Sequence, residues 1–155
     1  MTGSTELTWR PIAVGRQAWS LGWEEKTQVA RIAGLVVIVR LGLWLLSMRK
    51  LLAWATVPLG KNRQHHVGLN ETVRLVDSVL ALRFTVWRPN CLTRSLVLAR
   101  ILRRSGHPVR VVIGIENGGQ CLQGHSWLEL DGRPFAEDGD PNDQFREILV
   151  SPART

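Results

Sequence analysis

Apolar residues recur at two different periods along the chain, and the change of period separates a helical part from a strand part. In stretches between residues 25 and 105, apolar positions recur at the three- and four-residue spacing of amphipathic helices. After Pro108 they alternate, as in Val109, Val111, Ile113 and Ile115, which is typical of a half-buried strand. Helices first and an antiparallel sheet second predict an α+β fold.

Three helices are predicted, over residues 25–55, 70–83 and 91–105. The first is long and very apolar, with acids at its start and basic residues toward its end. Each prediction rests on start or stop signals in the sequence: Pro58-Leu59-Gly60, Asn70, Pro89-Asn90 and Gly106.

Three strands are predicted, over residues 109–115, 121–130 and 133–138. The Asp131-Gly132 pair between the last two is a strong signal for a two-residue hairpin turn. From residue 139 the chain is acidic and loop-like, and it ends in a short apolar stretch over 145–150.

The chain has 155 residues, the size of one ordinary domain. We predict two regions within it. Residues 1–68 form an irregular arm and the long apolar helix, a candidate docking surface for a partner, and residues 69–155 form the core that carries the sheet.

Composition and charge exclude several classes of protein. Hydrophobic residues make up 45% of the chain and charged residues 21%, so overall disorder is excluded. With only 2 cysteines, a small disulfide-stapled fold is excluded too. A formal charge of +7 favours an acidic partner, but the bases are spread out and match no nucleic-acid-binding motif, so no nucleic acid is expected.

The polar start of the chain contains no secretory signal, which predicts a cytoplasmic protein whose cysteines are free thiols. The most apolar stretch, residues 33–48, is short for a membrane span and has Arg40 at its middle. We therefore expect this helix to pack on the domain rather than span a membrane. Docking on a partner protein or a membrane surface is the alternative, which Trp44, Trp54, Arg49 and Lys50 would suit.

Cys91 stands at the start of the third predicted helix. Unpaired backbone N–H groups and the positive end of the helix dipole favour a thiolate there, and the same N–H groups can hold an oxyanion. His125, in the strand region, is the candidate general base. Cys121 has no helix start before it, so we interpret it as structural.

Hairpin geometry suggests which carboxylate orients the histidine. If Asp131-Gly132 is a two-residue turn, His125 lies directly opposite Asp138 on the same face, and Glu137 points to the other face. A bulge after the turn would bring Glu137 round instead. A helix-borne cysteine, a strand-borne histidine and a carboxylate would form an acyl-transfer triad.

Two further features give no assignment. The adjacent His65 and His66 have no third ligand at suitable spacing, and no glycine-rich phosphate loop is present, so neither a metal nor another cofactor is expected. The second oxyanion donor stays open between Asn90, Trp87 and Gln123.

Two separated motifs, CLTRSLVLARILRRSGHPVRVVIGI and GHSWLELDGRPF, resemble the leader peptidase of lasso-peptide biosynthesis. That peptidase is a thiol protease of the transglutaminase-like cysteine-protease superfamily. The resemblance covers roughly residues 84–145 and implies a papain-like core in which the cysteine-bearing helix packs on a small antiparallel sheet. It also implies Cys91 as nucleophile and His125 as base. Ungapped comparison places Glu137 where the family usually has Asp, whereas hairpin parity favours Asp138.

The resemblance further implies a hydrolase that matures ribosomal peptides by removing the leader of a precursor peptide before a separate macrolactam cyclase acts. No strand pattern for a leader-binding module precedes the core, so we expect a split peptidase subunit that works with a leader-recognition subunit. Any need for ATP is expected to reside in the cyclase or the complex. Three alternatives stay open: a noncatalytic adaptor of the maturation complex, a membrane-associated helper, and transglutaminase-like amide crosslinking.

Overall fold

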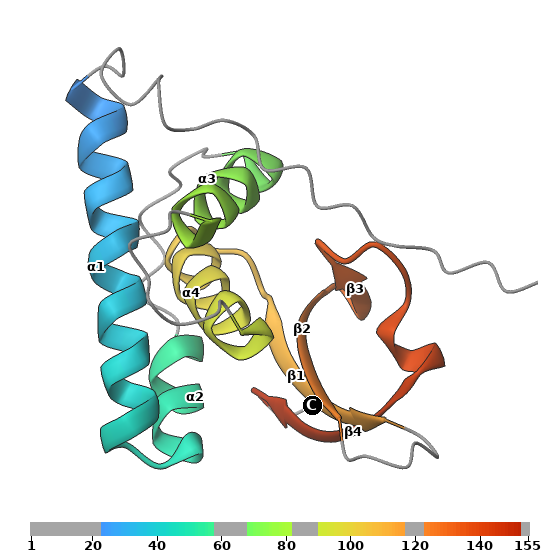
Figure 1. Ribbon diagram of the computed structural model, residues 1–155. Coiled ribbons are helices and arrows are strands. Elements are labelled where there is room, and N and C mark those ends of the chain that lie inside the picture. Colours follow the sequence, from blue (N-terminus) through green and yellow to red (C-terminus); the bar gives the residue numbers. More distant parts are fainter. Residues whose placement is uncertain (1–22, 58–67, 82–89, 117–122, 153–155) are drawn as a thin grey trace, which may run out of the picture.

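The computed structural model describes residues 23–57, 68–81, 90–116 and 123–152, and this part of the chain has the predicted α+β fold (Figure 1). The helices lie on one side of a four-stranded antiparallel sheet (Figure 1). In chain order the elements are α1 (Trp23–Leu45), α2 (Met48–Thr56), α3 (Leu69–Ala81), α4 (Cys91–Arg104), β1 (Arg110–Glu116), β2 (Gly124–Leu130), β3 (Arg133–Phe135), the 3-10 helix η1 (Pro141–Asp143) and β4 (Phe145–Ser151).

The long helix predicted over residues 25–55 is two helices, so that prediction was wrong. The chain leaves the helical conformation before Ser47, whose backbone is extended, and α2 folds back against α1. Gly42 makes this close approach feasible, because a Cβ atom there would lie 2.8 Å from Leu51 Cδ1. The reversal buries Leu51 and Ala55 in the core, which stabilises the helical hairpin.

α4 lies between the other helices and the sheet (Figure 1), and its bounds confirm the helix predicted to begin at Cys91. Leu96, Leu98 and Leu102 of α4 are fully buried in a core shared by all four helices and the sheet. Its basic residues do more than complement the dipole of their own helix. Arg100 Nη1 donates to the Trp54 carbonyl (2.7 Å) and Arg103 Nε to the Thr56 carbonyl (2.8 Å), at the negative end of α2.

The strand order is β3-β2-β1-β4, with all neighbours antiparallel. β4 occupies the edge beside β1 and comes from the stretch over 145–150, which the sequence marked as apolar but not as a strand. Helices cover one face of β1 and β2, where Val111 and Leu128 join the core. Side chains alternate along β2, so His125 and Trp127 leave the strand on the other side from Leu128, and His125, at the start of β2, reaches Glu137, which also binds Arg94 of α4.

The hairpin between β2 and β3 has the predicted two-residue turn, with Leu130 paired to Arg133. Asp131 and Gly132 both have positive φ angles (52° and 78°), as a type I′ turn requires. The ladder stops at Phe135, because Ala136 also adopts a positive φ of 60° and turns the chain out of the strand. The expected pairing of His125 with Asp138 was therefore wrong.

The proposed division between residues 1–68 and 69–155 stays a prediction. Residues 58–67, just before that division, lie outside the described part of the chain, as do Trp87 and Cys121.

Candidate active site

Cys91 occupies the first position of α4, as the sequence predicted. The helix is capped by Asn90, whose extended backbone precedes the first turn and whose side-chain oxygen accepts from the Thr93 N–H (2.8 Å). The thiol of Cys91 is free and half-buried. Helix geometry leaves the backbone N–H groups of this turn without intrahelical acceptors, so the turn can stabilise a thiolate or an oxyanion.

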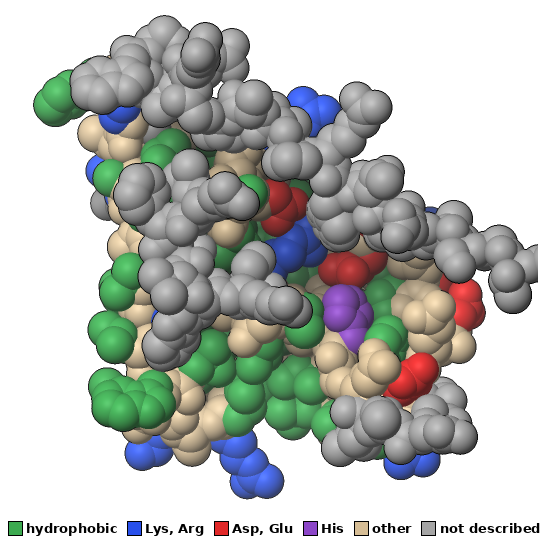
Figure 2. Space-filling view, viewed as in Figure 1, with side chains coloured by type: hydrophobic (Ala, Val, Ile, Leu, Met, Phe, Trp, Pro, Cys, Tyr) green, Lys and Arg blue, Asp and Glu red, His purple; other side chains and the backbone are tan. Residues whose placement is uncertain are grey.

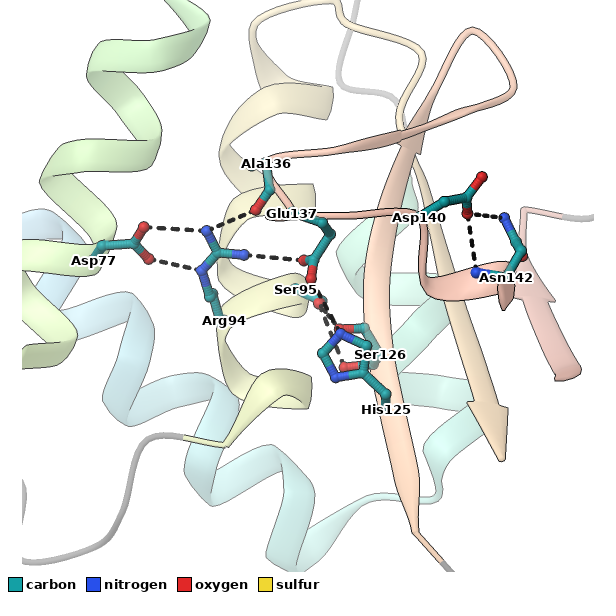
Figure 3. A network of polar contacts seen from close by, with 9 residues as sticks. All are labelled: Asp77, Arg94, Ser95, His125, Ser126, Ala136, Glu137, Asp140 and Asn142. Carbon is teal, nitrogen blue, oxygen red and sulfur yellow. Dashed lines mark hydrogen bonds and ion pairs between the residues drawn. The ribbon is translucent and has the colours of Figure 1, made fainter. Parts of the chain in front are cut away.

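A pair of serines joins α4 to β2 one turn after Cys91. Ser95 Oγ donates to the Ser126 carbonyl (2.9 Å), and the two hydroxyls lie 3.4 Å apart (Figure 3). Both side chains are buried, so this join is shielded from water. It brings the cysteine-bearing end of α4 beside the start of β2, where His125 lies next to Ser126.

His125 is held by aromatic contacts and by one carboxylate. Its ring stacks on Trp127 (centroids 5.9 Å apart, 18° between planes) and lies tilted against Phe145 (5.2 Å, 36°). Its Nε2 lies 3.1 Å from Glu137 Oε2. Because an ionised carboxylate only accepts, Nε2–H is the donor, and Nδ1 is the nitrogen left to receive a proton from a thiol.

Gly114 allows this aromatic cluster to form. It lies directly opposite His125 on β1, and a Cβ atom there would lie 2.9 Å from Trp127 Cη2 and 3.0 Å from Phe145 Cβ. Trp127 is fully buried. Any larger residue at 114 would displace the two rings that support His125.

Glu137, rather than Asp138, reaches the histidine. The left-handed turn at Ala136 redirects the chain after β3, so the Glu137 side chain points to His125 (Figure 3). Asp138 is exposed. Only 16% of the Glu137 side chain is exposed, which shields its contact with His125 from solvent. The alternative carboxylate considered from the sequence is thus the one that the structure places against the imidazole.

Two residues that the sequence analysis did not assign to the site, Arg94 and Asp77, hold Glu137 from behind (Figure 3). Arg94 Nη1 donates to Glu137 Oε1 (3.2 Å), and Nη2 donates to the Ala136 carbonyl (3.1 Å). On its other side, Arg94 forms a bidentate pair with Asp77 of α3 (2.7 and 3.1 Å). In Figure 2, acidic, basic, acidic and histidine side chains follow one another across this surface.

The electrostatics of Arg94 follow from these partners. Burial by itself would lower the pKa of Arg94, but the hydrogen bond and charge of Asp77, with the charges of Glu137 and Asp138, outweigh burial and raise the pKa above its usual range. Arg94 therefore stays a fixed positive charge beside the carboxylate. The Cys91–Arg94 spacing of three residues, which puts both side chains on the first turn of α4, was the sequence signal that could have pointed to it.

The structure brings His125 and Glu137 together and places Cys91 at the adjoining helix start, but among the described residues no hydrogen bond joins the thiol to the imidazole. Catalytic hydrogen bonds are often long in unliganded enzymes and shorten when substrate binds. Of the candidate oxyanion donors in the described part, Gln123 is exposed and the Asn90 side-chain oxygen caps α4. No group of metal-ligating side chains occurs among the described residues.

A sequence profile for the Transglutaminase-like superfamily matches residues 33–150, from the middle of α1 to the end of β4. The chain belongs to the transglutaminase-like superfamily. No curated protein and no solved structure matches it significantly. A transglutaminase-like domain is compatible with a cysteine protease or a related activity, and the site described above lies entirely within the matched region.

Proposed function

We propose that this transglutaminase-like protein is a cysteine peptidase with Cys91 as nucleophile, His125 as general base and Glu137 as the residue that orients the histidine. The observation that carries the proposal is the 3.1 Å contact between His125 Nε2 and Glu137 Oε2, beside the helix start that bears a free thiol. The finer assignment is removal of the leader from a lasso-peptide precursor. It rests on the resemblance of residues 84–145 to that family.

In the acylation step, His125 Nδ1 takes the proton of Cys91, and the thiolate attacks the carbonyl carbon at the end of the leader. The carbon–sulfur bond forms as the carbonyl becomes an oxyanion, which the N–H groups at the start of α4 stabilise. Collapse of this intermediate breaks the peptide C–N bond. His125 returns its proton to the departing amine of the core peptide, and a thioester to Cys91 remains.

In the second step, His125 removes a proton from water, and the resulting hydroxide attacks the thioester carbonyl. The carbon–sulfur bond breaks, the leader leaves with a new carboxylate, and the thiol is regenerated. The freed α-amine of the core is the group that a macrolactam cyclase requires. A separate leader-recognition subunit would supply leader binding, and the cytoplasm is the proposed compartment.

Glu137 has two functions in this mechanism. Accepting from Nε2–H fixes the tautomer that leaves Nδ1 free for the thiol, and its charge stabilises the imidazolium formed during acylation. Arg94 and Asp77 position Glu137 rather than touch the reacting atoms. Of the four bonds that Arg94 donates, two hold Glu137 and its neighbouring carbonyl.

Mass spectrometry of a lasso precursor peptide, incubated with this protein and its leader-recognition partner, tests the function. We expect cleavage at one leader–core junction by the wild type and none by Cys91→Ala. Equal processing by both proteins would exclude Cys91 from the chemistry. If neither protein cleaves while a separate positive-control peptidase does, the adaptor hypothesis replaces this one, and crosslinking to an added amine in place of hydrolysis would indicate a transglutaminase.

The assignment of Glu137 as the third member of the proposed triad is tested with a matched pair of isosteric variants. Glu137→Gln removes the acceptor charge beside His125 and should lower kcat by about 100-fold or more, in line with the loss of a group that fixes histidine tautomer and charge. Asp138→Asn changes an exposed neighbour and should keep at least half of the wild-type rate. The reverse ranking would return the function to Asp138.

A further inference from the structure

The outward side of α1 is apolar where a soluble helix is normally polar. Five large side chains at helical spacing form what we call the α1 outer face: Val37, Ile38, Leu41, Trp44 and Leu45. The exposed fractions of these five residues range from 52% to 82%. Figure 2 shows hydrophobic side chains along this edge of the molecule, which Figure 1 identifies as α1. A contiguous apolar patch of this kind marks an interaction surface.

The core does not require the α1 outer face, because α1 packs through its opposite side. Ile32, Val36 and Val39 are buried against the other helices. Within the described part of the chain, Lys26–Leu45 is the segment long and apolar enough to cross a membrane by length and composition. To span a membrane, α1 would have to withdraw its buried side chains from the core. The helix is therefore expected to contact a membrane through its exposed face only.

The net positive charge of the chain comes from α1 and the residues that follow it. Residues 26–70 contain seven Lys or Arg and no Asp or Glu, whereas the rest of the chain has equal numbers of acids and bases. Lys26 and Arg31 are exposed near the start of α1, and Arg49 and Lys50 are exposed just beyond its end. The apolar face thus has basic side chains at both ends.

We propose that the α1 outer face docks flat on an anionic phospholipid bilayer. Apolar side chains would enter the boundary between headgroups and acyl chains, and the basic residues at both ends would contact lipid phosphates. Trp44, 82% exposed near the end of α1 that precedes Arg49 and Lys50, is the residue type that membrane interfaces favour. A second copy of the chain fits this face less well, because its own basic residues would meet those of the first.

Docking in this orientation leaves the candidate active site accessible. α1 and the sheet lie on opposite sides of α4 (Figure 1), so a bilayer beneath α1 faces away from His125 and Glu137. The proposal does not depend on the peptidase function, since it rests on different residues. It predicts a protein that is held at a membrane while its site faces solution.

Flotation of the full-length protein with vesicles tests the proposal. We expect the protein to float with vesicles of phosphatidylcholine mixed with phosphatidylglycerol, and not with phosphatidylcholine alone. Raising the salt concentration should release it. Leu41→Gln should weaken partitioning about tenfold or more, because a polar side chain replaces a leucine that the bilayer would bury. The double variant Arg49→Gln/Lys50→Gln should weaken it about 25-fold, at about fivefold for each charge near anionic lipid.

Matched variants elsewhere on the surface serve as controls. Ile148→Gln replaces an apolar side chain on β4 that is 54% exposed, close to the 52% of Leu41, and it should float like the wild type. Arg133→Gln/Arg146→Gln removes the same charge from exposed positions in β3 and β4 and should have less than a threefold effect.

Three outcomes would overturn the proposal. One is the absence of flotation with anionic vesicles, or flotation that Leu41→Gln does not change. A second is a concentration-dependent oligomer in solution that Leu41→Gln dissolves, which would mean that a second copy covers the face. The third is retention on vesicles after washing with high salt and alkali, which would indicate a spanning helix.

Discussion

Replacing Arg94 with lysine should impair the site more than the fold. Lysine keeps the positive charge but has a single ammonium group in place of a planar fork. Arg94 donates at 2.7–3.2 Å to acceptors on two sides, Asp77 on one and Glu137 with the Ala136 carbonyl on the other. One ammonium group cannot reach both sides at these distances, so the variant loses the hydrogen bonds to either Asp77 or Glu137.

The size of the effect follows from exposure. The Arg94 side chain is 25% exposed and Asp77 is 43% exposed, so solvent weakens this pair. Losing about two of the four hydrogen bonds should cost about 1–2 kcal/mol of unfolding free energy, which for a chain of this length lowers Tm by about 3–8 °C. Freeing Glu137 should lower kcat by about 10- to 100-fold, the range typical of residues that orient a functional group from behind.

Two assays separate these effects. Thermal unfolding gives the stability change, and the pH dependence of Cys91 alkylation by iodoacetamide, in a Cys121→Ser background, reports how well His125 assists the thiol. The alkylation profile should shift in Arg94→Lys and in Glu137→Gln alike. Arg74→Lys, at an exposed position of α3, is the matched control and should change neither.

Two results would contradict the positioning role of Arg94. If Arg94→Lys keeps the wild-type alkylation profile and kcat while losing stability, Arg94 is a structural residue only. If the effects of Asp77→Asn and Arg94→Lys on kcat add independently, the two residues do not act through one network.

Two further predictions concern packing. Gly114→Ala puts a methyl group 2.9 Å from Trp127 Cη2, so we expect a loss of about 1–3 kcal/mol in unfolding free energy and a lower kcat. Thermal melts and peptide cleavage measure the two effects. The control Gly34→Ala, whose added Cβ would have nothing within 4 Å, should not destabilise the protein. Arg100→Met removes the hydrogen bond to the Trp54 carbonyl of α2 and the guanidinium that lies 4.5 Å from the centre of the Trp54 ring, so Tm should fall by about 5–10 °C. The control Arg104→Met, at an exposed position, should keep Tm within about 2 °C of the wild-type value.

Local signals in the sequence were sufficient for most of the fold. The cap at Asn90, the alternation along β1 and the Asp131-Gly132 turn each act over a few residues, and the structure confirms all three. The break between α1 and α2 was not predictable in this way. Neither proline nor a turn pair marks it, and it follows from the tertiary contact that Leu51 makes over Gly42.

The candidate site was predictable where it depends on strand and helix starts, and not where it depends on a bend. Cys91 and His125 lie on regular elements, so the sequence located both. The choice between Glu137 and Asp138 depended on the backbone of Ala136, a residue type that gives no warning of a positive φ. Asp77 was missed because its pairing with Arg94 joins two helices, 17 residues apart in the chain.

The Asp77–Arg94 pair contributes more to the geometry of the candidate site than to the stability of the fold. A pair this exposed contributes little stability by itself, because solvent screens it and two long side chains must be ordered to form it. What the pair does achieve is a fixed direction for Arg94, whose remaining donors reach Glu137 and the Ala136 carbonyl. The strained turn at Ala136 needs such an anchor, since a non-glycine residue with positive φ persists only where its surroundings hold it. Without Asp77, only the bonds to Glu137 and the Ala136 carbonyl would direct Arg94, so the turn and the carboxylate beside His125 would be held less firmly.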